Sequence, residues 1–327
     1  MSLYRDILAK AWHITWRYKY LWFFGLFAAL LGNGGELELI FRGFNAEFSQ
    51  GLFPWLQGIA ETGFFNVSTI HNIGYLLIND PITILTIFAV FLIVIFLSIF
   101  LIWLVIVSQA ALVNNAANSI SGKSHDFKDG LAVGMKKFWP VLGLNVLIKI
   151  VVYLLFVLIS LPGIIMISRA DLLTVKVLFV LSFIIFIPIS IILAFIVKYA
   201  IAYAVIKGSK ISQAIKEGWD LFVKNWLVSL EMAFILFFIN FVIGLGLILV
   251  LLIISVPFLF LALLLIKSGM LINFGIFLAI SILFYLAIIA IVGAALATFQ
   301  ISSWTGLFIK LVGRGGASKL ARVFGKK

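Results

Sequence analysis

Residues 226–266 read WLVSLEMAFILFFINFVIGLGLILVLLIISVPFLFLALLLI, an apolar run that carries a single charged side chain, Glu231. Five further stretches of the chain are similarly apolar. In chain order the six stretches are residues 16–32, 82–113, 139–165, 177–206, 226–266 and 271–308. A bilayer core is crossed by roughly 20 apolar residues in a helix. The sequence therefore predicts a membrane protein with six crossings.

The composition also indicates that lipid surrounds most of the chain. The chain is 64% hydrophobic and 11% charged, with a mean hydropathy of +1.25, whereas a soluble domain carries about 25% charged residues. Only helices and closed barrels satisfy their backbone polar groups in hydrocarbon. The long runs lack the alternating pattern, roughly ten residues long, of barrel strands. We therefore expect an all-α, polytopic bundle of transmembrane helices.

The basic residues indicate the orientation of the chain. If the N-terminus is cytoplasmic, 18 of the 24 Lys and Arg residues fall on the cytoplasmic side: Arg5, Lys10, Arg17, Lys19, Lys123, Lys128, Lys136, Lys137, Lys207, Lys210, Lys216, Lys224, Lys310, Arg314, Lys319, Arg322, Lys326 and Lys327. This asymmetry is what the positive-inside rule predicts for cytoplasmic N- and C-termini. Topology thus explains the net charge of +12, and no nucleic-acid partner is expected.

Short motifs recur along the chain at similar spacing. Residues 106–110 (IVSQA), 196–200 (IVKYA) and 291–295 (IVGAA) lie near the predicted inner ends of the second, fourth and sixth spans, 90 and 95 residues apart. The motifs ISLP, ending at Pro162, and ISVP, ending at Pro257, are again 95 apart. Such periodicity indicates internal repeats.

We predict one membrane domain, residues 1–311, and a flexible basic tail, residues 312–327. The domain comprises three pseudo-repeats, residues 1–115 with an outer loop at 33–80, 124–206 and 209–308. Each repeat is an interfacial amphipathic helix followed by a transmembrane hairpin. Apolar residues at helical spacing mark the amphipathic helices: Tyr4, Ile7, Leu8, Ala11, Trp12 and Thr15; Phe127, Leu131, Gly134, Met135 and Phe138; Ile211, Ala214, Ile215, Gly218, Trp219 and Phe222. We expect their apolar faces to lie in the acyl boundary of the bilayer.

The fifth stretch is longer than one perpendicular crossing. At ~1.5 Å per residue it would reach about twice the thickness of a bilayer core. Proline removes a backbone donor and disturbs a helix interior. We therefore expect Pro257 to end the spanning helix near Ser255, with a short outer segment beyond it.

Charged residues inside predicted spans are candidates for function. Lys149, Lys198 and Glu231 are of this kind, and all three lie in the inner half of the membrane by residue count. They define a possible polar pocket that Asn145 and Asn240 could join. The alternative is structural, because the charged side chains can snorkel or form an ion pair, and the two amides can hydrogen-bond between helices.

No motif indicates a cofactor or a metal site. The chain has no Cys, its three His residues fall in separate segments, and neither H-E-x-x-H nor a Walker A sequence occurs. The basic tail is expected to contact anionic phospholipid headgroups through four residues. These are Lys319, Arg322, Lys326 and Lys327.

The third amphipathic segment carries a resemblance to a known family. Residues 214–222 (AIKEGWDLF), followed by Lys224, Asn225 and Trp226, resemble uncharacterised bacterial six-span proteins similar to the membrane domain of some glycerophosphodiester phosphodiesterases. The resemblance implies a multi-pass protein of a bacterial-type inner (plasma) membrane. It implies no hydrolase activity, because the soluble phosphodiesterase domain and its metal-binding constellation have no counterpart in this sequence.

These observations favour a non-enzymatic membrane protein, either a transporter-like bundle or a scaffold that engages lipid, and they leave an unknown membrane partner open. The alternative is a membrane-embedded, lipid-modifying enzyme. In that case an inner-leaflet pocket around Lys149, Lys198 and Glu231 would hold the substrate.

Overall fold

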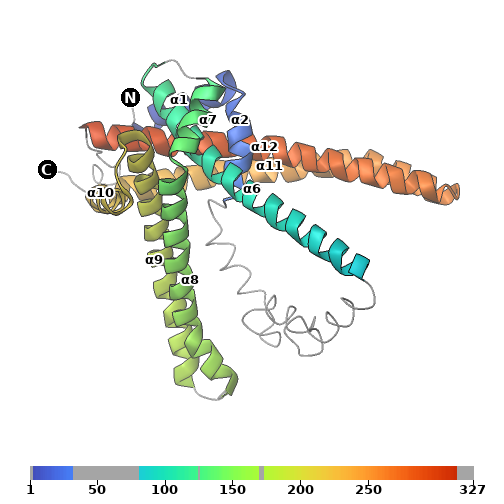
Figure 1. Ribbon diagram of the computed structural model, residues 1–327, viewed down its shortest axis with the longest axis horizontal. Helices are drawn as coiled ribbons and strands as arrows, with labels where there is room; N and C mark the ends of the chain where they lie inside the picture. Colours follow the sequence, from blue (N-terminus) through green and yellow to red (C-terminus); the bar gives the residue numbers. More distant parts are fainter. Residues whose placement is uncertain (1–2, 32–80, 124–125, 169–172, 315–327) are drawn as a thin grey trace. The chain divides into compact units, whose positions relative to one another are not determined.

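A computed structural model describes residues 3–31, 81–123, 126–168 and 173–314. Every regular element in these residues is a helix (Figure 1), as the sequence predicts. The predicted outer loop at residues 33–80 and the four basic tail residues, Lys319, Arg322, Lys326 and Lys327, lie outside the described residues.

Five helices are long and apolar enough to cross a membrane. They are α6 (Pro81–Ile120), α8 (Phe138–Ser168), α9 (Leu173–Ala202), α11 (Trp226–Lys267) and α12 (Leu271–Arg314). They correspond to the second to sixth apolar stretches. Large apolar side chains project from them, such as Val242 and Ile253 of α11, which are 65% and 71% exposed. Apolar exposure on this scale is compatible with lipid as the surrounding medium.

The first apolar stretch is organised differently. Helix α1 (Leu3–Arg17) takes its first two residues, and α2 (Leu21–Ala29) follows after a short break. At ~1.5 Å per residue, α2 reaches only about 14 Å. The boundary predicted at residue 16 is therefore wrong, because the amphipathic pattern of α1 runs through Arg17. A membrane crossing by this first stretch, which would be the sixth in total, stays a prediction.

The predicted break at Pro257 is also wrong. Helix α11 continues through this proline to Lys267. A proline removes one intrahelical hydrogen bond, whereas a helix end would leave up to four carbonyls without an intrahelical partner, so continuing the helix costs less than stopping it. The neighbouring Ser255 hydroxyl donates to the Leu251 carbonyl at 2.7 Å and accepts from the Tyr285 hydroxyl at 3.1 Å, which links α11 to α12.

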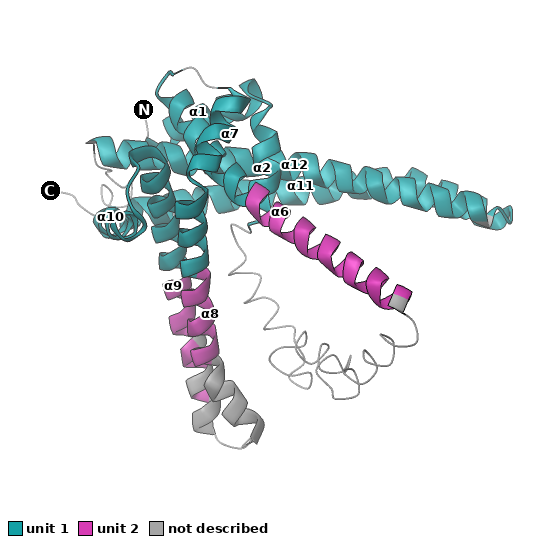
Figure 2. Ribbon diagram, viewed as in Figure 1, with its two compact units in different colours: residues 1–32, 105–148, 191–327 teal, residues 33–104, 149–190 magenta. Residues whose placement is uncertain are grey.

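The chain forms two compact units (Figure 2). Unit 1 comprises Met1–Gly32, Val105–Ile148 and Ile191–Lys327, and unit 2 comprises Asn33–Leu104 and Lys149–Ser190. In unit 2, α8 and α9 pack through Phe156 and Phe186, whose ring centroids are 6.1 Å apart. Unit 1 contains the shorter helices as well as most of the buried core.

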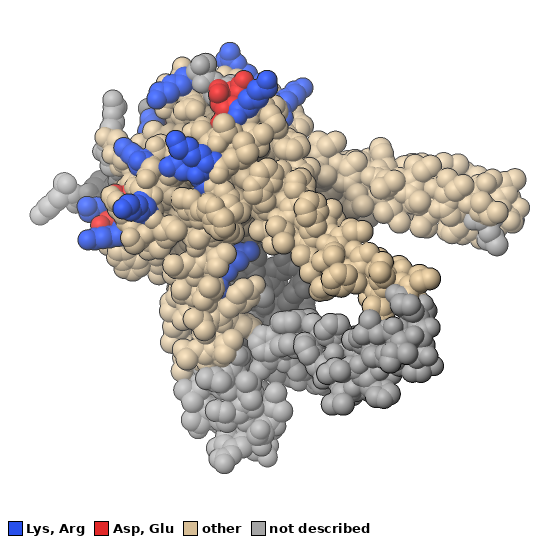
Figure 3. Space-filling view, in the orientation of Figure 1, with Lys and Arg blue, Asp and Glu red and all other residues tan. Residues whose placement is uncertain are grey.

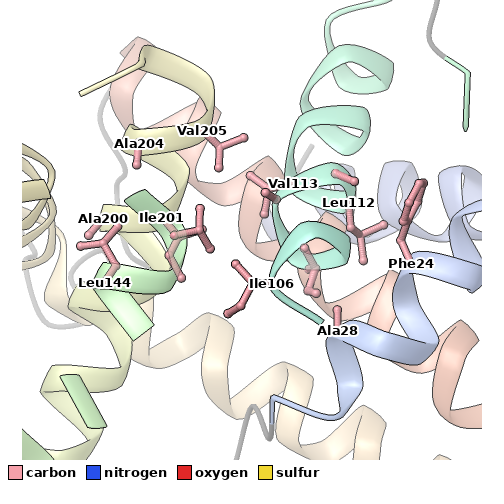
Figure 4. Packing of buried hydrophobic residues seen from close by; sticks show 14 of the residues in the cluster. Phe24, Ala28, Ile106, Leu112, Val113, Leu144, Ala200, Ile201, Ala204 and Val205 are labelled. Atoms are coloured by element: carbon pink, nitrogen blue, oxygen red, sulfur yellow. The ribbon is translucent and has the colours of Figure 1, made fainter. Parts of the chain in front are cut away.

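Unit 1 has two hydrophobic clusters. The first joins α2, α6, α8 and α9 through residues such as Phe24, Leu112, Leu144 and Ile201 (Figure 4). The second joins α1, α9, α11 and α12 with the amphipathic helix α10 (Ile211–Lys224). A short π-helical turn, η2 (Tyr203–Lys207), extends α9.

The predicted amphipathic helices are present as α1, α7 (Phe127–Lys136) and α10. From the sequence we expected their apolar faces to lie against lipid. In the structure these faces also pack against protein. In α10 the small and aromatic residues Ala214, Gly218 and Phe222 are buried against protein, while Trp219 is exposed. The reason is helical spacing, because Ala214, Gly218 and Phe222 recur every four residues on one face of the helix and Trp219 lies off that face.

Candidate functional site

Two glycines bring the amphipathic helices α7 and α10 into close contact with the long helices α6 and α9. A Cβ atom placed on Gly134 of α7 would lie 2.5 Å from the Val107 carbonyl oxygen of α6. One placed on Gly218 of α10 would lie 2.9 Å from the Ile196 carbonyl oxygen of α9. Both contacts fall on the recurring motifs IVSQA and IVKYA. Only glycine permits the helix backbones to approach this closely.

A third close approach involves α2 and α12. A Cβ atom on Gly25 would collide with the Thr298 hydroxyl and the Ala294 carbonyl. The Thr298 hydroxyl donates to the Leu21 carbonyl at 3.2 Å as well as to Ala294 at 2.8 Å. Ala294 lies within the third motif, IVGAA.

Polar side-chain pairs stand beside the first two contacts. The Asn145 amide of α8 donates to the Gln109 side chain of α6 at 2.8 Å, and both residues are buried. The hydroxyls of Tyr199 (α9) and Ser229 (α11) are 2.6 Å apart, also in the core. Asn145 lies 11 residues after Gly134, and Ser229 lies 11 residues after Gly218. The two pairs therefore occupy matching positions in the sequence.

Asn240, the other predicted amide, also bonds across helices. Its side-chain oxygen accepts from the Gln300 amide of α12 at 2.7 Å. Asn145 and Asn240 thus both form hydrogen bonds between helices, which was the structural alternative to a polar pocket. Within a membrane such bonds hold helices together, because the alternative is an unsatisfied polar group in hydrocarbon.

Glu231 lies on α11 and is half-buried. Its carboxylate accepts a hydrogen bond from the Tyr4 hydroxyl of α1. Tyr4 itself is 3% exposed and belongs to the cluster that joins α1, α11 and α12. The bond therefore anchors the N-terminal helix to an acidic group near the start of a long helix.

Lys198 of α9 is stacked against aromatic rings. Its Nζ lies 4.7 Å from the centroid of the Trp304 ring and 5.9 Å from that of Phe195. Phe195 and Trp304 are themselves in ring contact at 5.5 Å. The quadrupole of an aromatic face attracts a cation, which lowers the cost of holding the ammonium among apolar side chains.

Lys149 is exposed and belongs to unit 2, whereas Lys198, Glu231, Asn145 and Asn240 belong to unit 1. The structure thus places four of the five predicted site residues in one unit, on separate helix contacts. An ion pair of Lys149 with Glu231 stays a prediction.

Sequence reasoning missed the uncharged partners in these contacts. They are Tyr4, Gln109, Tyr199, Ser229, Gln300 and Trp304. Tyr199 and Gln109 carried a usable signal, because each is the fourth residue of its recurring motif. No comparable sequence signal marks Trp304 or Gln300.

Charge and tryptophan gather at one end of unit 1. On the face shown in Figure 3, most Lys and Arg lie over the end that carries α1, α7 and α10, and the projecting part of α11 and α12 shows none, although α11 ends at the exposed Lys267. Exposed tryptophans occur in or beside the same helices: Trp12 55%, Trp16 46%, Trp139 74%, Trp219 50% and Trp226 55%. Trp and Lys together are typical of the level of lipid headgroups.

Comparisons with protein-family profiles, curated proteins and solved structures return no match. Within the described ranges, no three His, Cys, Asp or Glu residues are grouped so that they could hold a metal ion. The resemblance to bacterial six-span proteins, which extends over most of the chain and is weakest in residues 33–80, stays a prediction.

Proposed function

We propose that this chain is a non-enzymatic scaffold of a bacterial-type inner membrane, which engages anionic lipid in the cytoplasmic leaflet through α1, α7 and α10. The observation that carries the proposal is the joint presence of exposed tryptophan and lysine at one end of unit 1. Trp rings favour the headgroup level, and lysines near a membrane surface attract anionic headgroups by about 1 kcal/mol each.

The proposal includes six spans with both termini in the cytoplasm. It also includes three repeats, each an interfacial segment followed by a hairpin. The matching glycine contacts of Gly134 and Gly218 support the repeats, as do the polar pairs Asn145–Gln109 and Tyr199–Ser229. The resemblance to bacterial six-span proteins is part of the same proposal.

A scaffold explains the intramembrane polar groups better than a transport path does. Asn145 and Asn240 are each bonded to a neighbouring helix, and the Glu231 carboxylate accepts from Tyr4. Groups used in this way fix helices relative to one another. A transport path requires polar groups that face a water-filled passage and exchange partners with the substrate.

Lipid selection tests the scaffold. The protein is purified from vesicles of mixed phosphatidylglycerol and phosphatidylcholine, and the ratio of the two co-purified lipids is measured. We expect enrichment of phosphatidylglycerol, and a reduction of that enrichment in the double variant Lys128→Gln, Lys216→Gln. Lys267→Gln, at the predicted outer end of α11, is the control. Equal enrichment in the double variant and the wild type would contradict the proposal.

Substitution of the charged residues tests the enzymatic alternative. Glu231→Gln and Lys149→Met are assayed for folding and for turnover of a labelled phospholipid. The scaffold predicts lower stability for Glu231→Gln and no turnover by the wild type. Turnover by the wild type that disappears in a stably folded variant would establish the enzyme instead.

A further inference from the structure

A cavity of about 310 Å³ lies in unit 1 where three helix ends meet. The C-terminal part of α6 and the turn after it provide Asn114, Asn118, Ser121 and Lys123. The end of η2 provides Lys207, and the C-terminal part of α12 provides apolar residues such as Phe308. The volume lies at the lower end of the range of small-molecule sites.

The polar lining of this cavity favours an anion. Asn118, Ser121, Lys123 and Lys207 supply amide, hydroxyl and ammonium donors, and no carboxylate is among the lining residues. Within the described chain, neither lysine forms an ion pair, and the side chains of Asn118 and Ser121 make no hydrogen bond. Two lysines with neutral donors beside them suit a phosphate group, which accepts several hydrogen bonds.

The free carbonyls at the C-terminal ends of helices carry partial negative charge, which would attract a cation and repel an anion. At two of the three ends a backbone amide beyond the helix caps one of these carbonyls. The Lys123 amide donates to the Asn118 carbonyl at 2.9 Å, and the Ser209 amide donates to the Tyr203 carbonyl at 3.3 Å. Gly122 and Gly208 adopt the left-handed conformation, φ 71° and 78°, that such caps require. The two ammonium groups therefore are not needed to satisfy these carbonyls.

We infer that this cavity binds a phosphate group, carried either by an anionic lipid headgroup or by free phosphate. The apolar residues on the α12 side would accommodate the glycerol and first acyl carbons of a lipid. The lipid form of this inference rests on the membrane placement proposed above. The phosphate chemistry rests on the cavity alone.

The test uses the full chain in maltoside micelles, which contain no phosphate. Calorimetric titrations with inorganic phosphate, dioctanoyl phosphatidylglycerol and dioctanoylglycerol separate the sources. We expect saturable binding of one phosphate-bearing probe per chain and none of dioctanoylglycerol. Phosphatidylglycerol binding without inorganic phosphate binding identifies a lipid headgroup, and binding of inorganic phosphate identifies a site for the free anion. Binding of neither phosphate-bearing probe, equal binding of dioctanoylglycerol, or Ca²⁺ binding in their place would overturn the inference.

Variants localise the site. The double variant Lys123→Gln, Lys207→Gln is expected to weaken binding about tenfold to thirtyfold, because both ammonium groups are lost. Lys19→Gln, Lys267→Gln carries the same change in net charge, lies outside the cavity lining and outside α1, α7 and α10, and is expected to keep the wild-type affinity. Asn118→Leu removes a donor without changing charge and is expected to weaken binding several-fold. Equal losses in the two double variants would refute a specific site.

This result is independent of the lipid-enrichment test. Loss of enrichment concerns many headgroups around α7 and α10, whereas the cavity titration concerns one saturable site. If the proposed function fails, Lys128→Gln, Lys216→Gln leaves lipid enrichment unchanged and the phosphate titration can still succeed. If the cavity inference fails, enrichment is unaffected.

Discussion

Replacing Gly134 by alanine places a methyl group directly against a neighbouring helix backbone. The new Cβ would lie 2.5 Å from the Val107 carbonyl oxygen and 2.8 Å from Val107 Cγ1, whereas ordinary contact begins at 3.4 Å. The helices would have to separate by the better part of an ångström. The oxygen is held in α6, so it cannot move aside as a flexible side chain does. Overpacking of this kind costs about 1–3 kcal/mol.

The same substitution also stabilises helix α7 itself. Alanine is favoured over glycine in a helix interior by about 0.5–1 kcal/mol. We therefore expect Gly134→Ala to lower the free energy of unfolding by about 0.5–2 kcal/mol. Gly218→Ala is expected to have a smaller effect in the same direction, because its Cβ would lie 2.9 Å from the nearest carbonyl oxygen.

Reversible unfolding in mixed detergent micelles, followed by circular dichroism, measures this change. Gly244→Ala and Gly246→Ala in α11 are matched controls, since a Cβ at either position meets no atom within 4 Å. The controls should be as stable as the wild type or slightly more stable. If Gly134→Ala behaves like these controls, α7 does not pack on α6 as described and the reasoning is refuted.

Two further changes test the polar contacts. A double-mutant cycle on Asn145→Ala and Gln109→Ala should give a coupling energy of about 0.6–2 kcal/mol, read from the same unfolding assay; additive losses would show that the two amides do not interact. Tyr4→Phe should lower stability by about 1.5–3 kcal/mol through loss of its hydrogen bond to the Glu231 carboxylate, and the loss should be smaller in a Glu231→Gln background; an equal loss in both backgrounds would show that Tyr4 does not act through this carboxylate.

The five long apolar helices were readable from the sequence because a run of this hydropathy and length favours a helix over any other structure. Hydrocarbon accepts a long apolar run only as a helix with its backbone bonds closed, so hydropathy alone located α6, α8, α9, α11 and α12. The expectation that the helix ends at Pro257 failed for a related reason. A local rule predicted a break at the proline, and the larger number of carbonyls that a helix end would leave without intrahelical partners outweighed it.

The site was only half accessible to sequence reasoning. Charge inside an apolar run identified Lys198 and Glu231 without any structure. Their partners are neutral and distant, since Tyr4 lies 227 residues from Glu231 along the chain. A tyrosine or tryptophan does not stand out in such a sequence, because both residues are common at interfaces and in cores. Which neutral residue contacts Lys198 or Glu231 depends on how the helices pack, so these partners are seen only in the three-dimensional structure.

The three close backbone approaches have a consequence for the proposed repeats. The α7 helix of the second repeat rests on α6 of the first, and the α10 helix of the third rests on α9 of the second. The α2 helix of the first repeat rests on α12 of the third. Each repeat thus contacts the last helix of the one before it, and the chain of contacts closes on itself. A closed set of this kind gives each of the three glycines a partner helix within unit 1, which supports the proposed threefold relation.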